Sequence, residues 1–261
     1  MFYITGDTHG DLDFDKLRLH NLTQQGIQIP SKDDKLIILG DFGLPFITPE
    51  NMKPHILQVY QECMNFLDKY PCQVLWIDGN HDNHDFWAKQ PITHMYGGKV
   101  QIHPLSSNVI HLMRGQVYDI DNTSVFTLGG ASSIDKCLRI EGSSWWAQEE
   151  VSNKECEEAL NNLHKYNNEV DIILTHTMPW SLIQEYEFKP FPDKTAQFLD
   201  IIYNNGLGKD KYGGVTYKQW FCGHFHEDRV MGKRLNCLYN DFIIYDKSRE
   251  KENEEEREER E

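Results

Sequence analysis

The clearest pattern along the chain is a series of short apolar runs, each followed by a polar segment that contains glycine. The run from Leu36 to Leu39 ends in Gly40 and Asp41, which is typical of a buried strand with a carboxylate at its C-terminal end. Runs at 2–5 and 73–77 have the same form. The pattern therefore predicts three buried strands, each followed by a polar loop.

The segments between these runs have helical spacing. Asp13 can cap a helix over 13–24, and apolar residues recur every three or four positions over 49–70. The first 82 residues therefore predict the order β-α-β-α-β. In open α/β sheets of this kind the active site lies at the carboxyl ends of the strands.

The second half of the chain is less regular. A group of short strands is expected at 100–103, 109–112, 115–120 and 124–128, and we expect it to form a second, more antiparallel sheet. Residues 129–150 form a long loop, and loops of this length are often functional. Ser152 and Glu155 form a capping box that opens the next helix. Later elements are expected as strands at 171–175 and 219–222, a helix that starts at Asp193 or Thr195 and runs to about Asn205, and final strands near 228–239 and 242–245.

Charge is unevenly distributed along the chain. The formal net charge is −15, and the tail from Glu250 to Glu261 holds eight glutamates against one lysine and two arginines. We expect residues 1–247 to form a single domain and residues 248–261 to be a solvated or disordered tail. The acidic balance argues against a general surface for duplex nucleic acid, which is usually basic.

The six cysteines are scattered and form no C-x-x-C pair, as is typical of reduced thiols in a cytosolic protein. The first residues resemble no secretory signal, and no apolar run approaches the length of a membrane span. The expected location is cytoplasmic, with no membrane partner. The oligomeric state is left open.

Five of the strand ends carry residue types that bind metals. They are Asp7-Thr8-His9, Gly40-Asp41, Gly79-Asn80-His81-Asp82, Thr175-His176 and Gly223-His224-Phe225-His226. Mixed imidazole and carboxylate ligands suit Mn²⁺, Fe²⁺ and Zn²⁺. Asp41 has two carboxylate oxygens and can bind one ion with each. Two ions about 3.5–4 Å apart can clamp a phosphate and generate a hydroxide near neutral pH.

These motifs, in this order, resemble those of the calcineurin-like metallophosphoesterases, and they span residues 6–226. The resemblance implies an α/β/β/α sandwich of two sheets. It implies one ion bound by Asp7, His9 and His226, a second bound by Asn80, His176 and His224, and Asp41 bridging both. It also implies that His81 is catalytic, stabilising or protonating the leaving oxygen.

The implied activity is hydrolysis of a phosphomonoester or phosphodiester by a hydroxide that bridges two divalent ions. Mn²⁺ is the expected metal, with Fe²⁺, Zn²⁺ and Ni²⁺ as alternatives, and the expected substrate is a small phosphate ester. A nuclease of the same superfamily and a non-catalytic binding scaffold are the alternative functions. Binding of nucleic acid is possible but not favoured.

The chain departs from the protein serine/threonine phosphatase branch after its second strand. That branch has a second aspartate, which orients the catalytic histidine, where this chain has Leu44, and it has a phosphate-binding arginine that is absent here. Arg139 in the long loop is our candidate for the missing phosphate contact. The terminal Gly-His-x-His resembles the phosphodiesterase and nuclease branches, and the long loop resembles one in bacterial and phage members.

Three other residues near the motifs have less specific expected roles. Asp82 is expected to be a structural hydrogen-bond acceptor. Trp145 and Trp146 either stack on a base or sugar of the substrate or anchor the long loop through apolar contacts.

Overall fold

Alternate residues of the central strands face different layers of the molecule. This is clear in the computed structural model, which describes residues 1–188, 192–204, 214–231 and 234–247. In β2 (Lys35–Ile38), Leu36 and Ile38 pack in a core against helix α2 (Pro54–Asp68). Ile37 and Leu39, which alternate with them, belong to a different core, which they share with side chains of a second sheet. A strand buried on both faces explains why the run is continuously apolar.

The first sheet is built around three parallel strands that begin the chain. Its order is β13-β1-β2-β3-β6-β5-β4, and the pairings from β1 to β6 are parallel while the outer ones are antiparallel. The remaining strands of this sheet are β1 (Phe2–Thr5), β3 (Gln73–Trp76), β4 (Ile92–Met95), β5 (Gly98–His103), β6 (Ser106–Leu112) and β13 (Phe242–Tyr245).

The second sheet is also mixed, with the order β11-β12-β10-β9-β8-β7. Strands β8, β9, β10 and β12 are parallel, and β7 and β11 pair antiparallel at the two edges. Its strands are β7 (Gln116–Ile120), β8 (Thr123–Leu128), β9 (Glu169–Thr175), β10 (Thr216–Cys222), β11 (Arg229–Met231) and β12 (Leu235–Cys237).

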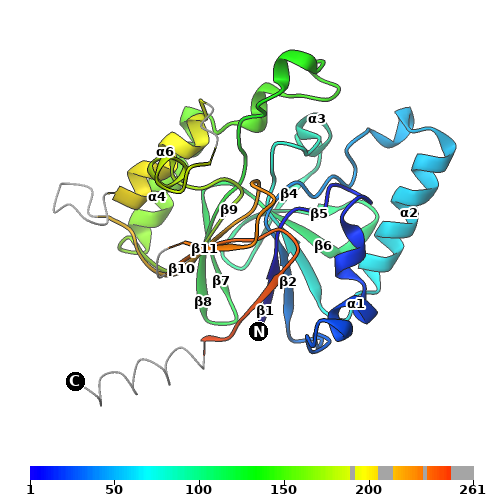
Figure 1. Cartoon of the computed structure of the whole chain (residues 1–261), viewed down its shortest axis with the longest axis horizontal. Coiled ribbons are helices and arrows are strands. Elements are labelled where there is room, and N and C mark those ends of the chain that lie inside the picture. The colour runs from blue at the N-terminus through cyan, green and yellow to red at the C-terminus, as the bar shows by residue number, and fades with distance from the viewer. Residues whose placement is uncertain (189–191, 205–213, 232–233, 248–261) are drawn as a thin grey trace.

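Helices cover the outer faces of both sheets (Figure 1). Helices α1 (Leu19–Gln24) and α2 lie on the outside of the first sheet. Helices α4 (Asn153–Lys165), α5 (Trp180–Glu185) and α6 (Lys194–Asn204) contribute to the core on the outside of the second sheet. A third core lies between the sheets. The expected α/β/β/α sandwich is confirmed.

The expectation that all strands of 99–129 belong to a second sheet is wrong. Strands β5 and β6 extend the first sheet beyond β3, and only β7 and β8 begin the second. The chain crosses between the sheets after Leu112, at the segment that contains Arg114 and Gly115. Both pairs are antiparallel hairpins with apolar residues on their strands, so the sequence pattern does not distinguish them.

The expected helix over 13–24 is interrupted. Phe14–Leu17 forms a 3-10 turn, and α1 begins only after the extended residue Arg18. The carboxylate of Asp13 caps no backbone N–H group, because it is hydrogen-bonded to Nδ1 of His9, 2.7 Å away. The capping box of Ser152 and Glu155 is present at the start of α4, as expected.

Two other expectations concern membrane-spanning segments and the end of the chain. No helix among the described residues is long and apolar enough to cross a bilayer. The acidic tail expected at 248–261 lies outside the described residues.

Candidate metal centre

The residues singled out in the sequence come from loops that follow parallel strands at one edge of the sandwich. Asp7, Asp41 and Asn80 follow β1, β2 and β3 of the first sheet. His176 and His224 follow β9 and β10 of the second. Because parallel strands end at the same edge, five distant segments of the sequence deliver their side chains to one place.

Asp41 lies at the centre of this group and is almost fully buried. Its Oδ2 atom is 3.3 Å from Nε2 of His9, and its Oδ1 atom is 3.3 Å from Nε2 of His176. The backbone N–H of His81 donates a hydrogen bond of 2.6 Å to Oδ1. The two oxygens of one carboxylate therefore face two different imidazoles.

On one side of Asp41, the ligand atoms of Asp7, His9 and His226 lie within 4.8 Å of one another. Nε2 of His226 is 3.4 Å from Oδ2 of Asp7, and the His9 and His226 rings lie 4.9 Å apart. His226 is held by stacking on Tyr239, with ring centroids 4.5 Å apart and planes 5° from parallel. This group has the membership that the resemblance implies for the first ion.

On the other side, one ligand atom each from Asp41, His176 and His224 lie within the same 4.8 Å limit. The Oδ1 atom of Asn80 is 3.1 Å from Nε2 of His176. These four residues are the ones that the resemblance implies for the second ion together with the bridge.

One histidine of each group is oriented by a hydrogen bond at its other ring nitrogen. Nδ1 of His176 is 2.7 Å from the carbonyl oxygen of Leu39, and Nδ1 of His9 is 2.7 Å from Asp13. When Nδ1 donates in the neutral imidazole, Nε2 keeps a lone pair that can bind a metal ion. Hydrogen bonds of this kind to the second nitrogen accompany histidine ligands in most metal sites.

The chemistry of this donor set fits divalent cations. Lone-pair atoms of Asp41, His176 and Asn80 converge at the second group, and such atoms repel one another unless a cation or proton lies between them. Burial opposes charge on His176, but the Asp41 and Asp7 carboxylates raise its pKa to about 10. A divalent ion would supply the positive charge that this proton otherwise provides.

Two glycines allow these loops to approach so closely. Gly40 has φ +100°, and a Cβ atom there would overlap Nδ1 of His176. A Cβ atom at Gly79 would overlap Oδ1 of Asp41. The glycines before the ligands are thus required by close packing as well as by the turn.

Asp82 ties the loops after β2 and β3 together. Its buried carboxylate accepts hydrogen bonds from the backbone N–H groups of Phe42, Gly43 and Gly79, at 3.3, 2.8 and 2.7 Å. The expectation that Asp82 is a structural acceptor is confirmed. Its bonds fix the positions of Asp41 and His81 relative to each other.

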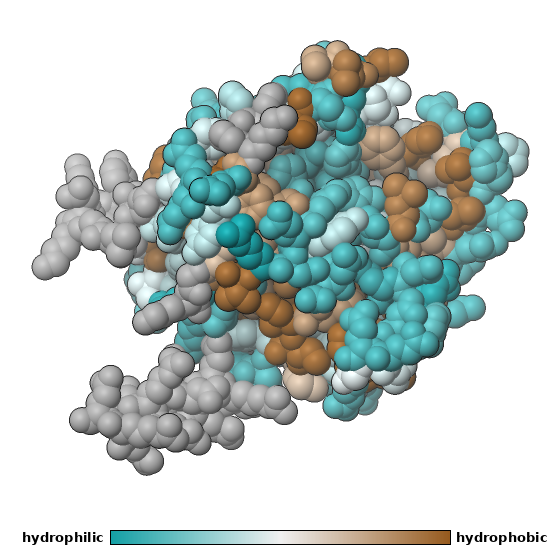
Figure 2. All heavy atoms as spheres, viewed as in Figure 1, coloured by the Kyte–Doolittle hydropathy of each residue, from teal (hydrophilic) through white to brown (hydrophobic). Residues whose placement is uncertain are grey.

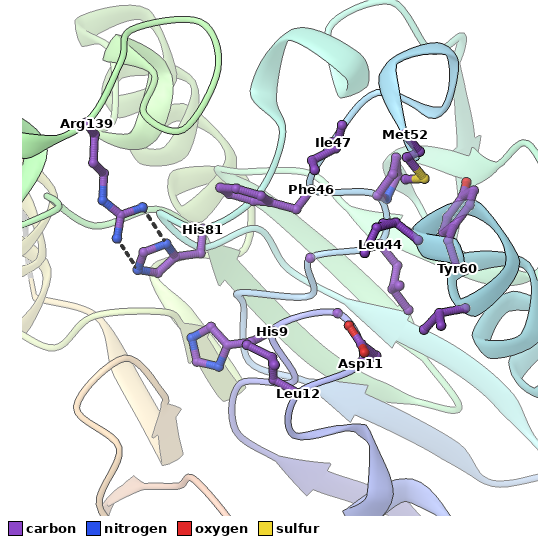
Figure 3. A pocket seen from close by; sticks show the side chains of 15 residues that line it. His9, Asp11, Leu12, Leu44, Phe46, Ile47, Met52, Tyr60, His81 and Arg139 are labelled. Carbon is purple, nitrogen blue, oxygen red and sulfur yellow. Dashed lines mark hydrogen bonds between the residues drawn. The ribbon is translucent and has the colours of Figure 1, made fainter. Parts of the chain in front are cut away.

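The structure also brings Arg139 to the site, although it is 58 residues from His81. Its guanidinium nitrogens lie 2.9 Å from Nδ1 and 3.3 Å from Nε2 of His81, as Figure 3 shows. The same side chain is held by Asp135 at 2.7 Å and by the carbonyl oxygen of Ser144 at 3.0 Å. Burial and the nearby Arg139 charge lower the pKa of His81, against the opposing effect of Asp41.

The loop that carries Arg139 is anchored by buried contacts. Trp146 is buried and packs edge-to-face on Phe46, with ring centroids 5.6 Å apart, so for Trp146 the anchoring alternative holds. The buried carboxylate of Glu149 accepts a 3.2 Å hydrogen bond from the backbone N–H of Ser133. Ser133 in turn accepts a 3.1 Å hydrogen bond from the amide of Asn80.

Sequence reasoning missed several residues that support the site. The sequence pattern predicts a helix cap at Asp13 and no role for Tyr239. Lys16 is buried beside the loop after β1, where it donates hydrogen bonds to the carbonyl oxygens of Asp7 and Tyr239, and burial lowers its pKa to about 8. The sequence gives no signal for this burial, because Lys16 occupies a polar position between Asp15 and Leu17.

Carboxylates and imidazoles gather in three overlapping groups at the loop edge of an α/β sandwich, an arrangement that suits a metal-dependent hydrolase. The family model described as calcineurin-like phosphoesterase matches residues 1–228, and the chain belongs to this family of metal-dependent phosphoester hydrolases. A comparison with curated proteins gives no match.

Proposed function

We propose that the chain hydrolyses small phosphate esters at a centre of two divalent ions, with Mn²⁺ as the native metal. The observation that carries this proposal is the position of Asp41, whose two oxygens face the two groups of ligands. Asp7, His9 and His226 would hold one ion and Asn80, His176 and His224 the other. Such a pair of ions clamps a phosphate and supplies a nucleophile at neutral pH.

The residues around the ions have separate tasks. His81 stabilises or protonates the leaving oxygen, because its side chain projects at the edge of the centre beside His9, with ring centroids 5.6 Å apart. Arg139 binds a phosphate oxygen, since its planar guanidinium matches phosphate geometry. Leu44 stands where the protein phosphatase branch has an aspartate. Arg139 lies 2.9 Å from Nδ1 of His81, which supports its role as the phosphate contact, but a guanidinium only donates and so does not replace the aspartate acceptor.

The first test measures hydrolysis of p-nitrophenyl phosphate and bis-p-nitrophenyl phosphate with added Mn²⁺. The Gly-His-x-His motif leads us to expect faster turnover of the diester. Faster turnover of the monoester would identify a phosphatase. The absence of hydrolysis of both esters would contradict the proposed function.

Substitution of His81 by alanine tests its role as the acid. We expect kcat to fall by about 10²-fold or more for an ester with an alkyl leaving group, and less for p-nitrophenyl esters, whose leaving group needs little protonation. The matched control is His20→Ala, at an exposed histidine. Equal losses for both leaving groups would mean that His81 does not act on the leaving oxygen.

Substitution of Arg139 by alanine tests the phosphate contact. A hydrogen bond to a charged group contributes about 1.5–3 kcal/mol, so kcat/KM is expected to fall about 10- to 100-fold. Arg139→Lys keeps the charge but loses the paired donors, and it should restore only part of the loss. Unchanged kinetics in both variants would show that Arg139 does not bind the substrate.

A further inference from the structure

A cavity of about 370 Å³ opens directly beside the candidate metal centre. One end is formed by His9, His81 and Arg139. From there it runs between the loop after β2 and helix α2, toward Met52 and Tyr60 (Figure 3). Its volume is within the range of pockets that bind small molecules, about 300–1,000 Å³.

The walls of this cavity are apolar away from the metal centre. They carry the side chains of Leu44, Phe46, Ile47, Met52, Ile56 and Val59. Ile47 and Ile56 are about two-fifths exposed, at 41% and 37%, although apolar side chains of this size are more often buried. The protein therefore maintains an open apolar surface within reach of the reacting phosphate.

Few polar side chains line the cavity beyond the site residues. Tyr60 contributes its ring, and its hydroxyl group is 3.3 Å from Nε2 of the buried His103, so this group already has a partner. Asp11 lies at the exposed margin. A nucleobase brings several donors and acceptors that need partners when buried, and these walls provide almost none. A hydrocarbon group has no such requirement.

The position of the cavity indicates which part of a substrate would enter it. A phosphate on the ions would lie next to His9, His81 and Arg139, which form the inner end of the cavity. The group attached to that phosphate would then extend along the apolar walls. We propose that this cavity binds a hydrocarbon chain, so that the substrates are amphiphilic alkyl phosphate esters. This inference rests on the proposed function, because it deepens the specificity of the same site.

The loop above the cavity continues the apolar surface. Ile134, Leu138 and Ile140 flank Arg139 in sequence and are 59%, 86% and 71% exposed. Figure 2 shows apolar side chains at the tip of this loop, at the top of the view. Exposed apolar surface of this kind typically marks an interaction site. Its position around Arg139 is consistent with a substrate whose tail is hydrocarbon.

The test uses alkylphosphonates, whose P–C bond is not hydrolysed, and measures their binding to the Mn²⁺-loaded protein by calorimetry. Methyl-, butyl-, hexyl- and octylphosphonate share one head group and differ only in chain length. Burial of one methylene contributes about 0.8 kcal/mol, so affinity is expected to rise about fourfold per methylene until the cavity is filled. Equal affinity across the series would overturn the inference, as would tighter binding of a nucleoside monophosphate than of hexylphosphonate.

The double variant Ile47→Glu/Ile56→Glu places two charges on the walls at already exposed positions. We expect the added negative charge to weaken binding of every phosphonate by a similar factor, and the affinity to lose most of its dependence on chain length. The matched control is Ile92→Glu on the edge strand β4, where the side chain is 54% exposed and lies outside the cavity. The inference would be contradicted if the control variant lost the same dependence on chain length, or if the double variant kept the wild-type dependence. Either result would mean that the hydrocarbon chain binds elsewhere.

Binding and turnover together separate the two proposals. If the protein binds longer phosphonates more tightly but hydrolyses no phosphate ester, the proposed function fails and the cavity keeps its assignment. If it hydrolyses esters but shows no gradient, the proposed function holds and the hydrocarbon cavity is wrong.

Discussion

Replacement of Asp41 by asparagine is expected to reduce turnover by about 10³-fold or more, beyond the 10- to 100-fold typical of residues that only support a metal ligand. Asparagine offers one oxygen in place of two, so it cannot face both ligand groups at 3.3 Å as the carboxylate does. It also removes a negative charge from the point where two ions would meet. The fold should persist, because the amide oxygen can still accept the hydrogen bond from the backbone of His81.

The measurements are kcat for the better of the two p-nitrophenyl esters and the number of Mn²⁺ ions bound per chain. The wild type is expected to bind two, and the variant fewer or more weakly. Added Mn²⁺ should raise the melting temperature of the wild type more than that of the variant, since an ion that binds only the folded state stabilises it. The control is Asp33→Asn, which makes the same charge change at an exposed position. Undiminished turnover in Asp41→Asn would refute the assigned bridge.

The sequence predicts those parts of the fold whose pattern has only one structural solution. Continuous apolar runs before glycine, as at Leu36–Leu39, occur because the strand is buried on both faces. The sheet membership of β5 and β6 could not be predicted in the same way. A hairpin on the edge of either sheet has the same alternation, and which sheet it joins depends on tertiary packing.

The candidate site divides in a similar way. Its metal-binding residue types are apparent, because aspartate, asparagine and histidine directly after an apolar strand do not contribute to a hydrophobic core. Their supporting residues are not apparent, because the roles of Asp13 and Lys16 depend on which atoms lie opposite them in space. Arg139 could be suspected only because the phosphate-binding arginine of the protein phosphatase branch is absent from its usual place after the second strand. Its contact with His81 joins residues 58 positions apart in the sequence.

A buried ion pair behind the site is the other place where one substitution should have a large effect. Arg114, at the crossing between the sheets, donates through Nε to Oδ2 of Asp78 at 2.7 Å, and both side chains are less than a tenth exposed. The guanidinium also donates to the carbonyl oxygens of Glu149 and Glu150, at 3.1 and 3.3 Å. The pair therefore joins the end of β3 to the base of the loop that carries Arg139.

Arg114→Met is expected to lower the free energy of unfolding at pH 7 by about 3–5 kcal/mol, because it leaves Asp78 buried without its main partner. Despite its burial, Asp78 has a depressed pKa, since Arg114 and His111 favour its charged form. Its contribution is therefore present above the ordinary aspartate pKa of about 3.9 and is lost as the pH falls below it. Without Arg114, burial dominates and raises the pKa of Asp78. The loss in free energy of unfolding caused by Arg114→Met should therefore be largest near pH 7 and become smaller as the pH falls.

Urea unfolding at pH 7 and pH 4 measures this difference, and hydrogen exchange over 129–150 shows whether the loop loosens. Arg18→Met provides the matched control, since Arg18 pairs with Asp15 at 2.6 Å on the exposed surface, where such pairs contribute at most about 1 kcal/mol. The double variant Asp78→Asn/Arg114→Met should recover part of the loss, because it removes the uncompensated charge. If Arg114→Met costs no more than Arg18→Met, the buried pair does not hold the loop in place, and the position of Arg139 over His81 must depend on Trp146 and Glu149 instead.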